Sequence, residues 1–497
     1  MNIAKNIERA SLYFPEKAAL IFEGRTYSYK ELNERVNRLA NALRALGVEK
    51  GDRVGVFLPN IPAFPIAYFA AQKLGAIVVS INVMSKKREV KYIADDSGCK
   101  ILFTTGELRE EVPRDELPAL EKIIIAEGEA GNDLDMETLM SGAAAECRCL
   151  DMDPNDPAAI LYTSGTTGFP KGATLTHMNV MSNSASAGNH SLVGPEDRMQ
   201  LFVPLFHCFG QNFIMNSAFT KCATLVMHRR FEPEPVLEAV VSHRVTMLFA
   251  VPTIFIYLLN MDTSRYDLSS VRYCFTAAAT MPRETALQWK EKFGIFAHEG
   301  YGLTECSPHT LYNHSYRFKH GSVGTPIENV DVRVADDEGN ELPPGEQGEI
   351  IVRGPNVMKG YWGKPEETAR AIRNGWLRTG DIGKMDDEGY FYITDRLKDM
   401  INAAGFNVYP NEVEQVIYQH PAVQEVAVYG VSDPIRGETV HASIVLKDGM
   451  QASEESIIEF CRANMSAYKV PRKIILTREL PKSPTGKILK RILRGDK

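Results

Sequence analysis

The feature that most constrains the fold of this chain is a repeated alternation of short apolar runs with helical segments. The apolar runs are short and rich in β-branched residues, and they span residues 54–58, 76–81, 101–104, 159–163, 224–227, 247–251 and 273–276. Strands that are apolar throughout are typical of parallel sheets whose two faces are covered by helices. The sequence therefore predicts an α/β fold, with doubly wound sheets in a large N-terminal domain.

The clearest helix is expected over residues 28–46. Ser28 can cap its N-terminus, and Glu31 follows at the spacing of a capping box. Apolar side chains then recur every three or four residues and form one stripe, namely Leu32, Val36, Leu39, Leu43 and Leu46. Gly47 is a natural stop, because glycine readily takes the left-handed conformation that ends many helices.

The sequence changes in character after about residue 320. Short strands between turns rich in Gly, Pro and Asp are expected at 330–334, 348–352 and 390–394, a pattern typical of a small antiparallel barrel. We place this barrel-like part at about 326–395. A compact α+β unit follows, with elements expected at 412–418, 425–429, 441–446, 454–461 and 473–476. We expect one domain over residues 1–395 and a smaller one over 396–497.

Composition excludes several classes of protein. The chain has 497 residues, of which 44% are hydrophobic and 24% charged, which excludes a disordered or fibrous protein. A net charge of −7 leaves no chain-wide basic field, so no nucleic-acid partner is expected. Eight cysteines without a Cys-x-x-Cys pair favour free thiols in a reducing compartment. Without a signal-peptide pattern or a transmembrane segment, we expect a cytoplasmic protein.

The strongest local signal for function is the run Tyr-Thr-Ser-Gly-Thr-Thr-Gly-Phe-Pro-Lys-Gly at 162–172, directly after an apolar strand. Its three glycines let the backbone turn tightly and direct N–H groups into one concavity, while hydroxyls and Lys171 add donors. This composition is typical of a phosphate cradle. The Walker A spacing is absent. A flexible surface loop is the alternative, which the preceding strand and the length of the run disfavour.

Six further motifs occur in order along the chain. They are Pro-Leu-Phe-His at 204–207, Tyr-Gly-Leu-Thr-Glu at 301–305, Gly-Trp-Leu-Arg-Thr-Gly-Asp at 375–381, Asp-Arg-Leu-Lys-Asp at 395–399, Gly-Phe-Asn-Val-Tyr-Pro-Asn-Glu-Val-Glu at 405–414 and Pro-Thr-Gly-Lys at 484–487. Together with the loop they resemble the adenylate-forming superfamily, which includes acyl-CoA synthetases, aryl-CoA ligases, peptide-synthetase adenylation domains and beetle luciferases. The resemblance covers essentially the whole chain. It implies that the smaller α+β C-terminal domain is mobile.

The resemblance also implies which residues bind the nucleotide and the metal. Tyr301 would stack on adenine, Thr304 would contact the α-phosphate, and Asp381 would accept from the ribose hydroxyls with help from Arg396. Glu305 and Thr163 would hold Mg²⁺. The other expected nucleotide-binding residues are Ser164, Gly165, Thr166, Thr167, Gly168 and Lys171 in the loop, with Ala277, Ala278, Glu299 and Gly300 on the adenine side. Taken alone, short strings such as Gly-Asp more often mark simple turns.

Five positions are implied for the acid and for acyl transfer. His207 would form a gate at the mouth of the acyl pocket, close to the carboxylate, and Lys487 would act in the adenylation transition state. Lys398 would be the hinge of the small domain, and Gly405 and Phe406 would border the thiol tunnel. Taken alone, His207 would be a core histidine and Lys398 a surface charge. Lys487 stands in a basic tail, but the prolines and the glycine before it predict a fixed turn.

The implied reaction is the activation of a carboxylic acid by Mg-ATP to an acyl-adenylate, followed by transfer to the thiol of coenzyme A. The form of the motif at 405–414 favours a medium- or long-chain fatty acid. The alternatives are an aryl acid, or transfer to the phosphopantetheine of an acyl carrier protein. Alanines at 277–279, where the family has more glycine, predict a narrower or shorter acyl tunnel.

Three alternatives remain, namely a carrier-protein acceptor, a non-catalytic adenylate-binding protein and a luciferase-like oxygenase. An insertion that blocks domain rotation is absent between 353 and 395, which favours coenzyme A over a carrier protein. A non-catalytic adenylate-binding protein would be expected to lack Glu305 or Lys487, and both are present. A luciferase-like oxygenase would share every adenylation motif, so O₂ consumption or light emission is needed to distinguish it.

Overall fold

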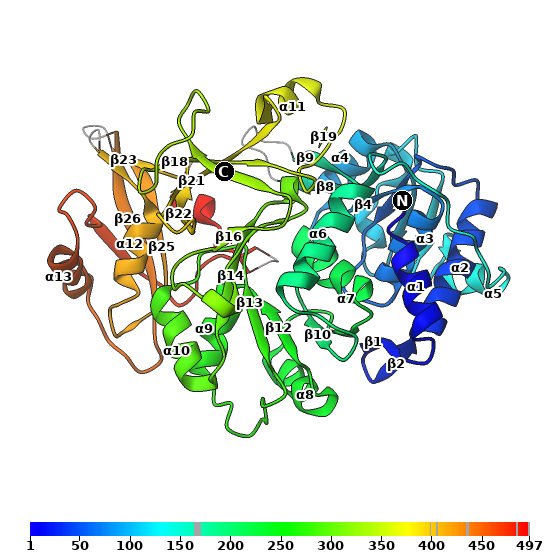
Figure 1. The fold of residues 1–497 in the computed structure, drawn as a ribbon, viewed down its shortest axis with the longest axis horizontal. Coiled ribbons are helices and arrows are strands. Elements are labelled where there is room, and N and C mark those ends of the chain that lie inside the picture. Colours follow the sequence, from blue (N-terminus) through cyan, green and yellow to red (C-terminus); the bar gives the residue numbers. More distant parts are fainter. Residues whose placement is uncertain (164–169, 398, 404–405, 434–436, 484–485, 496–497) are drawn as a thin grey trace.

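A computed structural model describes residues 1–163, 170–397, 399–403, 406–433, 437–483 and 486–495 of the chain. The molecule is elongated, with the N-terminal elements at one end and the C-terminal elements at the other (Figure 1). Its described strands form four sheets. Two large, mainly parallel sheets make up the N-terminal part, as the alternating apolar runs predict.

The first large sheet has eight strands. In spatial order they are β19 (Gly360–Tyr361), β9 (Lys171–Thr176), β8 (Pro157–Thr163), β4 (Ile77–Ser80), β3 (Arg53–Val56), β5 (Cys99–Thr104), β6 (Lys122–Ile125) and β7 (Leu134–Asp135). The strands from β8 to β7 are parallel, and β9 and β19 are antiparallel additions at one edge. Val78 and Val79 are both buried, in hydrophobic cores on opposite faces of this sheet. Burial on both faces explains why these strands are apolar throughout.

The second large sheet has nine strands. They are β16 (Thr325–Pro326), β15 (His309–Tyr312), β14 (Ala297–Gly302), β13 (Tyr273–Thr276), β12 (Met247–Ala250), β10 (Arg198–Leu201), β11 (Thr224–Met227), β1 (Ala18–Phe22) and β2 (Arg25–Ser28). Helix α6 (His177–His190) contacts β8 and β9 of the first sheet and β15 of the second. One hydrophobic core therefore extends between the two sheets.

Helix α2 (Tyr29–Ala45) is close to the helix predicted at 28–46. The Ser28 hydroxyl accepts from the Glu31 N–H at 3.1 Å, so the predicted N-cap is confirmed. The capping box is not completed, because the Glu31 carboxylate accepts from Arg25 at 2.8 Å instead. Gly47 has a φ of +83°, which suits its place just after the helix.

The remaining helices lie mostly around the large sheets (Figure 1). They are α1 (Lys5–Tyr13), α3 (Ala63–Lys73), α4 (Lys87–Ser97), α5 (Met136–Ser141), α7 (Ser217–Thr220), α8 (Pro233–His243), α9 (Pro252–Asn260), α10 (Arg283–Phe293) and α11 (Pro365–Ala371). Among the described residues, no helix is both long enough and apolar enough to cross a membrane.

The region expected to form a small barrel contains a five-stranded antiparallel sheet. Its strands are β17 (Asp331–Ala335), β18 (Gly348–Arg353), β21 (Trp376–Met385), β20 (Ile372–Arg373) and β22 (Phe391–Arg396). The long strand β21 pairs with β18 along one edge and with β20 and β22 along the other. Beyond β22, Phe391 bridges Gly324, and beyond β17, Ala335 bridges Glu341, so both outer strands have further partners.

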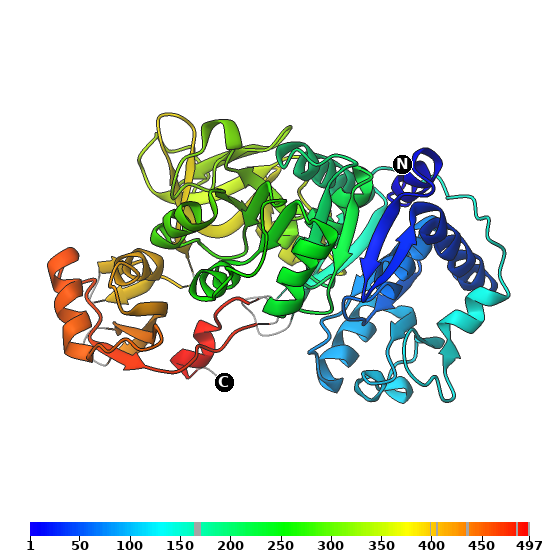
Figure 2. The ribbon, with the colours of Figure 1, turned by 90° about the horizontal axis from the view of Figure 1, so that it is seen from below.

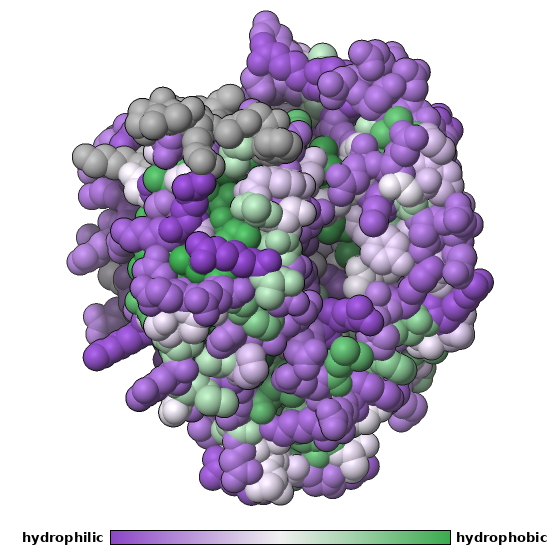
Figure 3. Space-filling model, turned by 90° about the vertical axis from the view of Figure 1, so that its left-hand side faces the viewer, coloured by the Kyte–Doolittle hydropathy of each residue, from purple (hydrophilic) through white to green (hydrophobic). Residues whose placement is uncertain are grey.

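The C-terminal unit has its own sheet and its own hydrophobic core. Its strands are β24 (Phe406–Val408), β23 (Ile401–Ala403), β26 (Gly437–Leu446), β25 (Val423–Asp433) and β27 (Lys473–Leu476), and its helices are α12 (Pro410–Ile417), α13 (Glu454–Asn464) and α14 (Lys490–Arg494). Figure 2 shows the last part of the chain returning from this unit toward the large domain. The face at the C-terminal end of the molecule is largely hydrophilic, with apolar groups between hydrophilic side chains (Figure 3).

Candidate functional site

Several of the predicted nucleotide-binding residues that the structure describes lie where the two large sheets meet. Thr163 is the last residue of β8, and Thr276 is the last residue of β13. Glu305 lies in the 3₁₀ turn η4 (Thr304–Cys306), just after β14. Ligands of α/β proteins commonly bind at the carboxyl ends of parallel strands, where loops supply the polar groups. The sequence motifs are therefore placed at the edge where such a site is expected.

Glu305 links these two sheets directly. The Thr163 hydroxyl donates to Glu305 Oε1 at 3.2 Å, and the Tyr361 hydroxyl donates to the same oxygen at 3.0 Å. The backbone carbonyl of Glu305 accepts from the Met358 N–H at 2.8 Å. The side chain and the backbone of Glu305 are thus both held by neighbouring elements.

The donor set at Glu305 fits a magnesium ion. Carboxylate and hydroxyl oxygens are hard ligands, and Mg²⁺ is commonly bound by one or two protein groups together with phosphate oxygens and water. Among the described residues, there is no group of three or more His, Cys, Asp and Glu side chains that could hold a metal ion. A metal at Thr163 and Glu305 would thus take most of its ligands from a nucleotide and from water.

The phosphate loop itself is only partly described. The predicted residues Ser164, Gly165, Thr166, Thr167 and Gly168 lie outside the described residues. Lys171 begins β9 and forms an ion pair with Glu367 of α11. Its ammonium nitrogen also lies 5.3 Å from the ring centre of Tyr361. The ammonium has three N–H donors, so a phosphate oxygen could join Glu367 as a partner of Lys171 or replace it.

Asp381 and Arg396 form the part of the site expected to bind ribose. Asp381 is only 5% exposed. The Tyr301 hydroxyl donates to Asp381 Oδ2 at 2.6 Å, and Arg396 Nε lies 3.1 Å from Asp381 Oδ1. The two strands β21 and β22 place Asp381 directly opposite Arg396 in the ladder. Each carboxylate oxygen therefore has one protein partner, and each retains a further lone pair that can accept from a ribose hydroxyl.

The predicted adenine side of the site contains a buried acid. Glu299 is 6% exposed, and its Oε1 accepts from the Met281 N–H at 2.9 Å. Burial raises the pKa of Glu299 to about 8, and the hydrogen bond from Met281 opposes the rise. Gly300 lies next in β14, where a Cβ would come within 2.5 Å of the Phe275 ring. Only a glycine fits between this ring and the strand.

Ala277 and Ala278 follow β13. Ala277 is half-buried and Ala278 is exposed. Ala278 has a φ of +72°, a region that disfavours any residue with a Cβ. Residues held in such conformations cluster at functional sites, where the surrounding structure imposes them. The backbone of Ala278 thus has a conformation that glycine adopts more easily than alanine. This agrees with the family pattern, which has more glycine at positions 277–279.

His207 and Lys487 lie close enough to influence each other. Burial lowers the pKa of His207 to about 4, and the positive charge of Lys487 lowers it further. His207 Nδ1 accepts from the Phe209 N–H at 3.2 Å, at the start of a buried π-helical segment, η3 (Phe209–Asn216). Burial raises the pKa of the adjacent Cys208 thiol, and the Glu305 carboxylate contributes to that rise. The segment 207–208 is therefore near enough to Lys487 and to Glu305 to feel both charges.

The C-terminal turn that carries Lys487 contacts the large domain. The Gly486 carbonyl accepts from the Thr253 hydroxyl at 3.4 Å, and a Cβ on Gly486 would come within 2.8 Å of Val251. Within the turn, the Ser483 N–H donates to the Lys487 carbonyl at 2.7 Å. This hydrogen bond between Ser483 and Lys487 supports the fixed turn that was predicted before Lys487.

Three predicted positions concern the hinge and the thiol tunnel. Lys398 and Gly405 lie outside the described residues, and Phe406 is described only as part of the β24 backbone. Thr304 opens η4 beside Glu305 and is half-buried.

Sequence reasoning missed the segment from β19 to α11. Tyr361 contacts Glu305, and Glu367 pairs with Lys171. Neither residue lies in a motif with a spacing that points to chemistry. The only available signal was the Gly-Tyr-Trp run at 360–362, and such a run is compatible with many structural roles.

A large cavity opens beside the Lys487 turn. Its volume is about 1180 Å³, and both domains line it. Its walls include Pro204 and Phe206 before His207, Val251 and Thr253 of the large domain, and Ser483 and Gly486 of the turn. This cavity is large enough for a sizeable organic substrate next to His207.

Two family models match the chain. The model described as AMP-binding enzyme matches residues 7–362, and the model described as AMP-binding enzyme C-terminal domain matches residues 412–487. A long-chain-fatty-acid–CoA ligase of Bacillus subtilis (strain 168) is 37% identical over 97% of this chain and 92% of its own length.

Solved structures resemble the whole chain. The anthranilate CoA ligase AuaEII in complex with anthranoyl-AMP has a TM-score of 0.94 at 31% identity, over 100% of this chain and 97% of that one. MatB from Rhodopseudomonas palustris has a TM-score of 0.92 when ATP-bound and 0.82 as the apo protein, at 31% and 32% identity, each over 100% of this chain and 99% of that one. The chain belongs to the AMP-binding enzyme family and is an AMP-forming acid–thiol ligase.

Proposed function

We propose that the protein activates a medium- or long-chain fatty acid with ATP and transfers the acyl group to the thiol of coenzyme A. In the first step, the carboxylate attacks the α-phosphorus of ATP, and pyrophosphate leaves. In the second step, the thiol sulfur attacks the carbonyl carbon of the acyl-adenylate, AMP leaves, and the thiol proton passes to solvent. The observation that carries this proposal is that the Thr163–Glu305 contact and a cavity of about 1180 Å³ beside the Lys487 turn occur in one chain with the motifs of an AMP-binding enzyme.

The first step brings two anions together, so the protein must stabilise negative charge. Lys487 would place an ammonium group beside the attacking carboxylate and the α-phosphate, and such preorganised charge is commonly the largest catalytic contribution. A magnesium ion held by Thr163 and Glu305 would supply further positive charge to the phosphates when bound. Asp381 and Arg396 would hold the ribose, so that the α-phosphate faces the acid.

His207 is suited to contact the acid rather than to transfer a proton. Because its pKa is lowered to about 4, the imidazole is neutral at physiological pH. A neutral imidazole carries no positive charge, so it would not compete with the Lys487 ammonium for the carboxylate of the acid. We therefore assign His207 the role of a gate at the mouth of the acyl pocket.

The second step requires the Lys487 turn to leave its place, because the thiol must reach the same carbonyl carbon. The described contacts between the two domains include Thr253 with Gly486 and the Arg283 N–H with Gln415 Oε1 at 3.2 Å. Such polar contacts are weak enough to exchange with water. The higher TM-score to ATP-bound than to apo MatB supports the view that this arrangement is the one used for adenylation.

The acid is proposed on two grounds. The motif at 405–414 favours a fatty acid, and the B. subtilis relative is named a long-chain-fatty-acid–CoA ligase. A second candidate is an aromatic acid, because stacked rings fill the space behind β14. The rings of Phe213 and Phe275 are 4.6 Å apart with an angle of 19° between their planes, and His309 packs on the edge of Phe213. If this buried cluster lies at the inner end of the acyl pocket, it would limit how deep an acyl chain could extend.

Coenzyme A is the proposed acceptor, and an acyl carrier protein is the alternative. The segment between Arg353 and Asp395 forms β19, α11, β20, β21 and β22, joined by short connections. It thus lacks the kind of insertion that would block domain rotation, which supports coenzyme A.

The proposal is tested by measuring pyrophosphate release over a panel of acids, each with and without coenzyme A. The panel should include octanoate, palmitate, benzoate, anthranilate and ferulate. Pyrophosphate release with a fatty acid, and thioester formation only when coenzyme A is present, is the expected result. Preference for an aromatic acid would favour the second candidate, and O₂ consumption would indicate an oxygenase. Release without any thioester would contradict the proposed acceptor.

A further inference from the structure

We propose that Tyr361 is a positioning residue for the metal-binding carboxylate of Glu305; this inference rests on the function proposed above. The Tyr361 hydroxyl and the Thr163 hydroxyl both donate to Oε1 of Glu305, at 3.0 and 3.2 Å. When two donors share one carboxylate oxygen, they fix the rotation of the carboxylate group. The other oxygen, Oε2, takes part in neither of these contacts and would be the oxygen available to a metal.

Tyr361 is itself held in place by its surroundings. Strand β19 pairs with β9, which puts Tyr361 opposite Ala173. The Tyr361 N–H donates to the Thr368 hydroxyl oxygen at 2.9 Å, and the Thr368 hydroxyl donates to the Lys364 carbonyl at 2.9 Å. The Lys171 ammonium lies over the ring. A side chain that is fixed at its backbone and at its ring can transmit its position to a neighbour.

The backbone of the same segment strengthens the link. The Met358 N–H donates to the Glu305 carbonyl, and the Trp362 N–H donates to the Gly172 carbonyl at 2.8 Å. The segment 358–362 therefore contacts both the turn that carries Glu305 and the far end of the phosphate loop. A displacement of this segment would change both at once.

The Tyr361 hydroxyl can act only as a donor to Glu305. A tyrosine hydroxyl has an ordinary pKa of about 10, and the Glu305 carboxylate oxygen has no proton to give when ionised. The hydroxyl is therefore a permanent donor near neutral pH. Because it never becomes an anion, it orients the carboxylate without repelling it.

The test is Tyr361→Phe, which removes the hydroxyl and keeps the ring beneath Lys171. Mn²⁺ binding to the protein with ATP, and without any acid, is measured by electron paramagnetic resonance. A hydrogen bond to a charged group is worth roughly a factor of ten in an equilibrium constant. We expect the Mn²⁺ dissociation constant to rise about tenfold, and the Mg²⁺ concentration for half-maximal pyrophosphate release to rise equally. Release at saturating Mg²⁺ should stay near that of the wild type.

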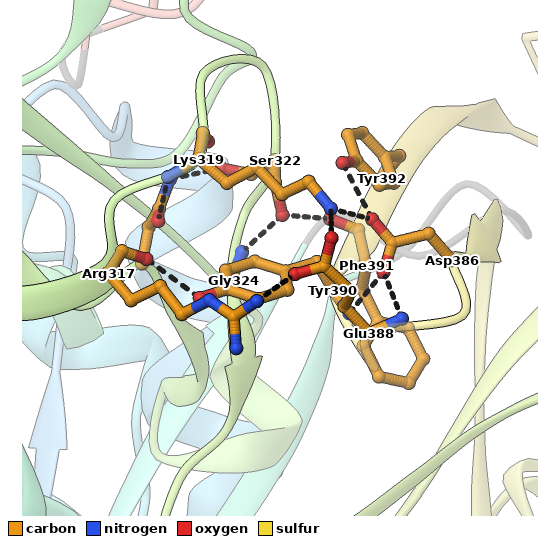
Figure 4. A network of polar contacts seen from close by, with 10 residues as sticks. Arg317, Lys319, Ser322, Gly324, Asp386, Glu388, Tyr390, Phe391 and Tyr392 are labelled. Carbon is orange, nitrogen blue, oxygen red and sulfur yellow. Dashed lines mark hydrogen bonds and ion pairs between the residues drawn. The ribbon is translucent and has the colours of Figure 1, made fainter.

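Tyr392→Phe is the matched control. The Tyr392 hydroxyl donates to Asp386 Oδ2 at 2.9 Å, in a polar network that also contains Lys319, Glu388 and Arg317 (Figure 4). This substitution also removes one tyrosine hydroxyl from a carboxylate, but away from Glu305. Its Mn²⁺ affinity should equal that of the wild type. Thr368→Val is a second variant that keeps the Tyr361 hydroxyl and loosens its backbone, and we expect a Mn²⁺ dissociation constant raised about threefold.

An unchanged Mn²⁺ affinity in Tyr361→Phe overturns the inference, as does a loss of activity that saturating Mg²⁺ does not restore. If Tyr361→Phe does not fold, an unchanged Mn²⁺ affinity in Thr368→Val overturns it instead. Failure of the proposed function gives a different result, because the wild type would then release no pyrophosphate with any acid. The Mn²⁺ titrations would still report on the role of Tyr361 in that case.

Discussion

The surroundings of Glu305 and of Lys487 show two different ways to place a charged group. Glu305 is held by Thr163, Tyr361 and Met358, which come from β8 and from the segment around β19. Lys487 stands on a turn with its own internal hydrogen bonds, and the contacts of that turn with the large domain include the Thr253–Gly486 bond. One charge is built into the large domain, and the other is brought to it by a second domain.

This difference is what a two-step reaction requires. Both proposed steps use a bound nucleotide, first as ATP and then as the adenylate, so its binding groups should stay in place. Only the first step uses the ammonium of Lys487, and the thiol later needs the same space. A group that must leave is better carried on a separate domain than on a core strand of the large domain.

The largest effect is expected for Lys487→Ala. Removal of a preorganised charge aimed at developing negative charge should lower pyrophosphate release by about 10²–10³-fold. Folding should be unaffected, since the turn retains its own hydrogen bonds. Lys473→Ala, an exposed lysine of the same domain, is the control and should retain full activity. Pyrophosphate release by Lys487→Ala at the wild-type rate would remove Lys487 from the first step.

A somewhat smaller loss is expected for Glu305→Gln. The amide keeps the size of the side chain and can still accept from Thr163 and Tyr361, but it loses the charge that opposes the metal. Pyrophosphate release at fixed Mg²⁺ should fall by roughly a hundredfold. The melting temperature should change little, and Glu388→Gln, in the network of Figure 4, should behave as the wild type. Near-normal release by Glu305→Gln would contradict the assignment of this carboxylate.

The buried carboxyl of Glu299 should make the stability of the protein depend on pH. Because its pKa is raised from 4.5 to about 8, the folded state holds a proton that the unfolded state has lost over this window. Stability should therefore fall as pH rises, by about 2–3 kcal/mol between pH 5 and 7 from this group. Glu299→Gln should flatten that fall, because its amide does not titrate. Urea unfolding at both pH values measures the difference, and parallel slopes in both proteins would refute it.

Ala278→Gly should give the smallest change. Relief of a positive φ should raise the free energy of unfolding by about 1 kcal/mol, since the strain removed exceeds the entropy cost of glycine. If Ala278 also lines the acyl tunnel, the variant should accept bulkier acids about tenfold better. Chemical denaturation and the acid panel measure the two effects separately. A less stable variant with an unchanged acid preference would contradict both.

The sequence predicted the large sheets well because their signal is local. Val78 and Val79 are both buried, on opposite faces, so an apolar run alone identifies such a strand. The antiparallel sheet was harder to predict, because spacing indicates short strands but not which of them pair with one another. The capping box at Glu31 failed for a similar reason, since Arg25 comes from a neighbouring strand and competes for the carboxylate.

In the candidate site, too, residues in local motifs could be predicted and tertiary contacts could not. Glu305, Asp381 and Lys487 lie in motifs that could be recognised by order and spacing. Tyr361 could not be found in this way, because its role depends on β19 pairing with β9 far along the chain. The pairing of Lys171 with Glu367 is also a tertiary contact that no local pattern predicts.

The central claim is that Lys487 serves the first step alone. The most direct test supplies Lys487→Ala with a chemically prepared acyl-adenylate and coenzyme A, and measures thioester formation. The account predicts a rate close to that of the wild type, although pyrophosphate release from ATP and the free acid is nearly lost. A loss of thioester formation as large as the loss of pyrophosphate release would contradict the claim that the C-terminal domain brings this charge to the site for one step only.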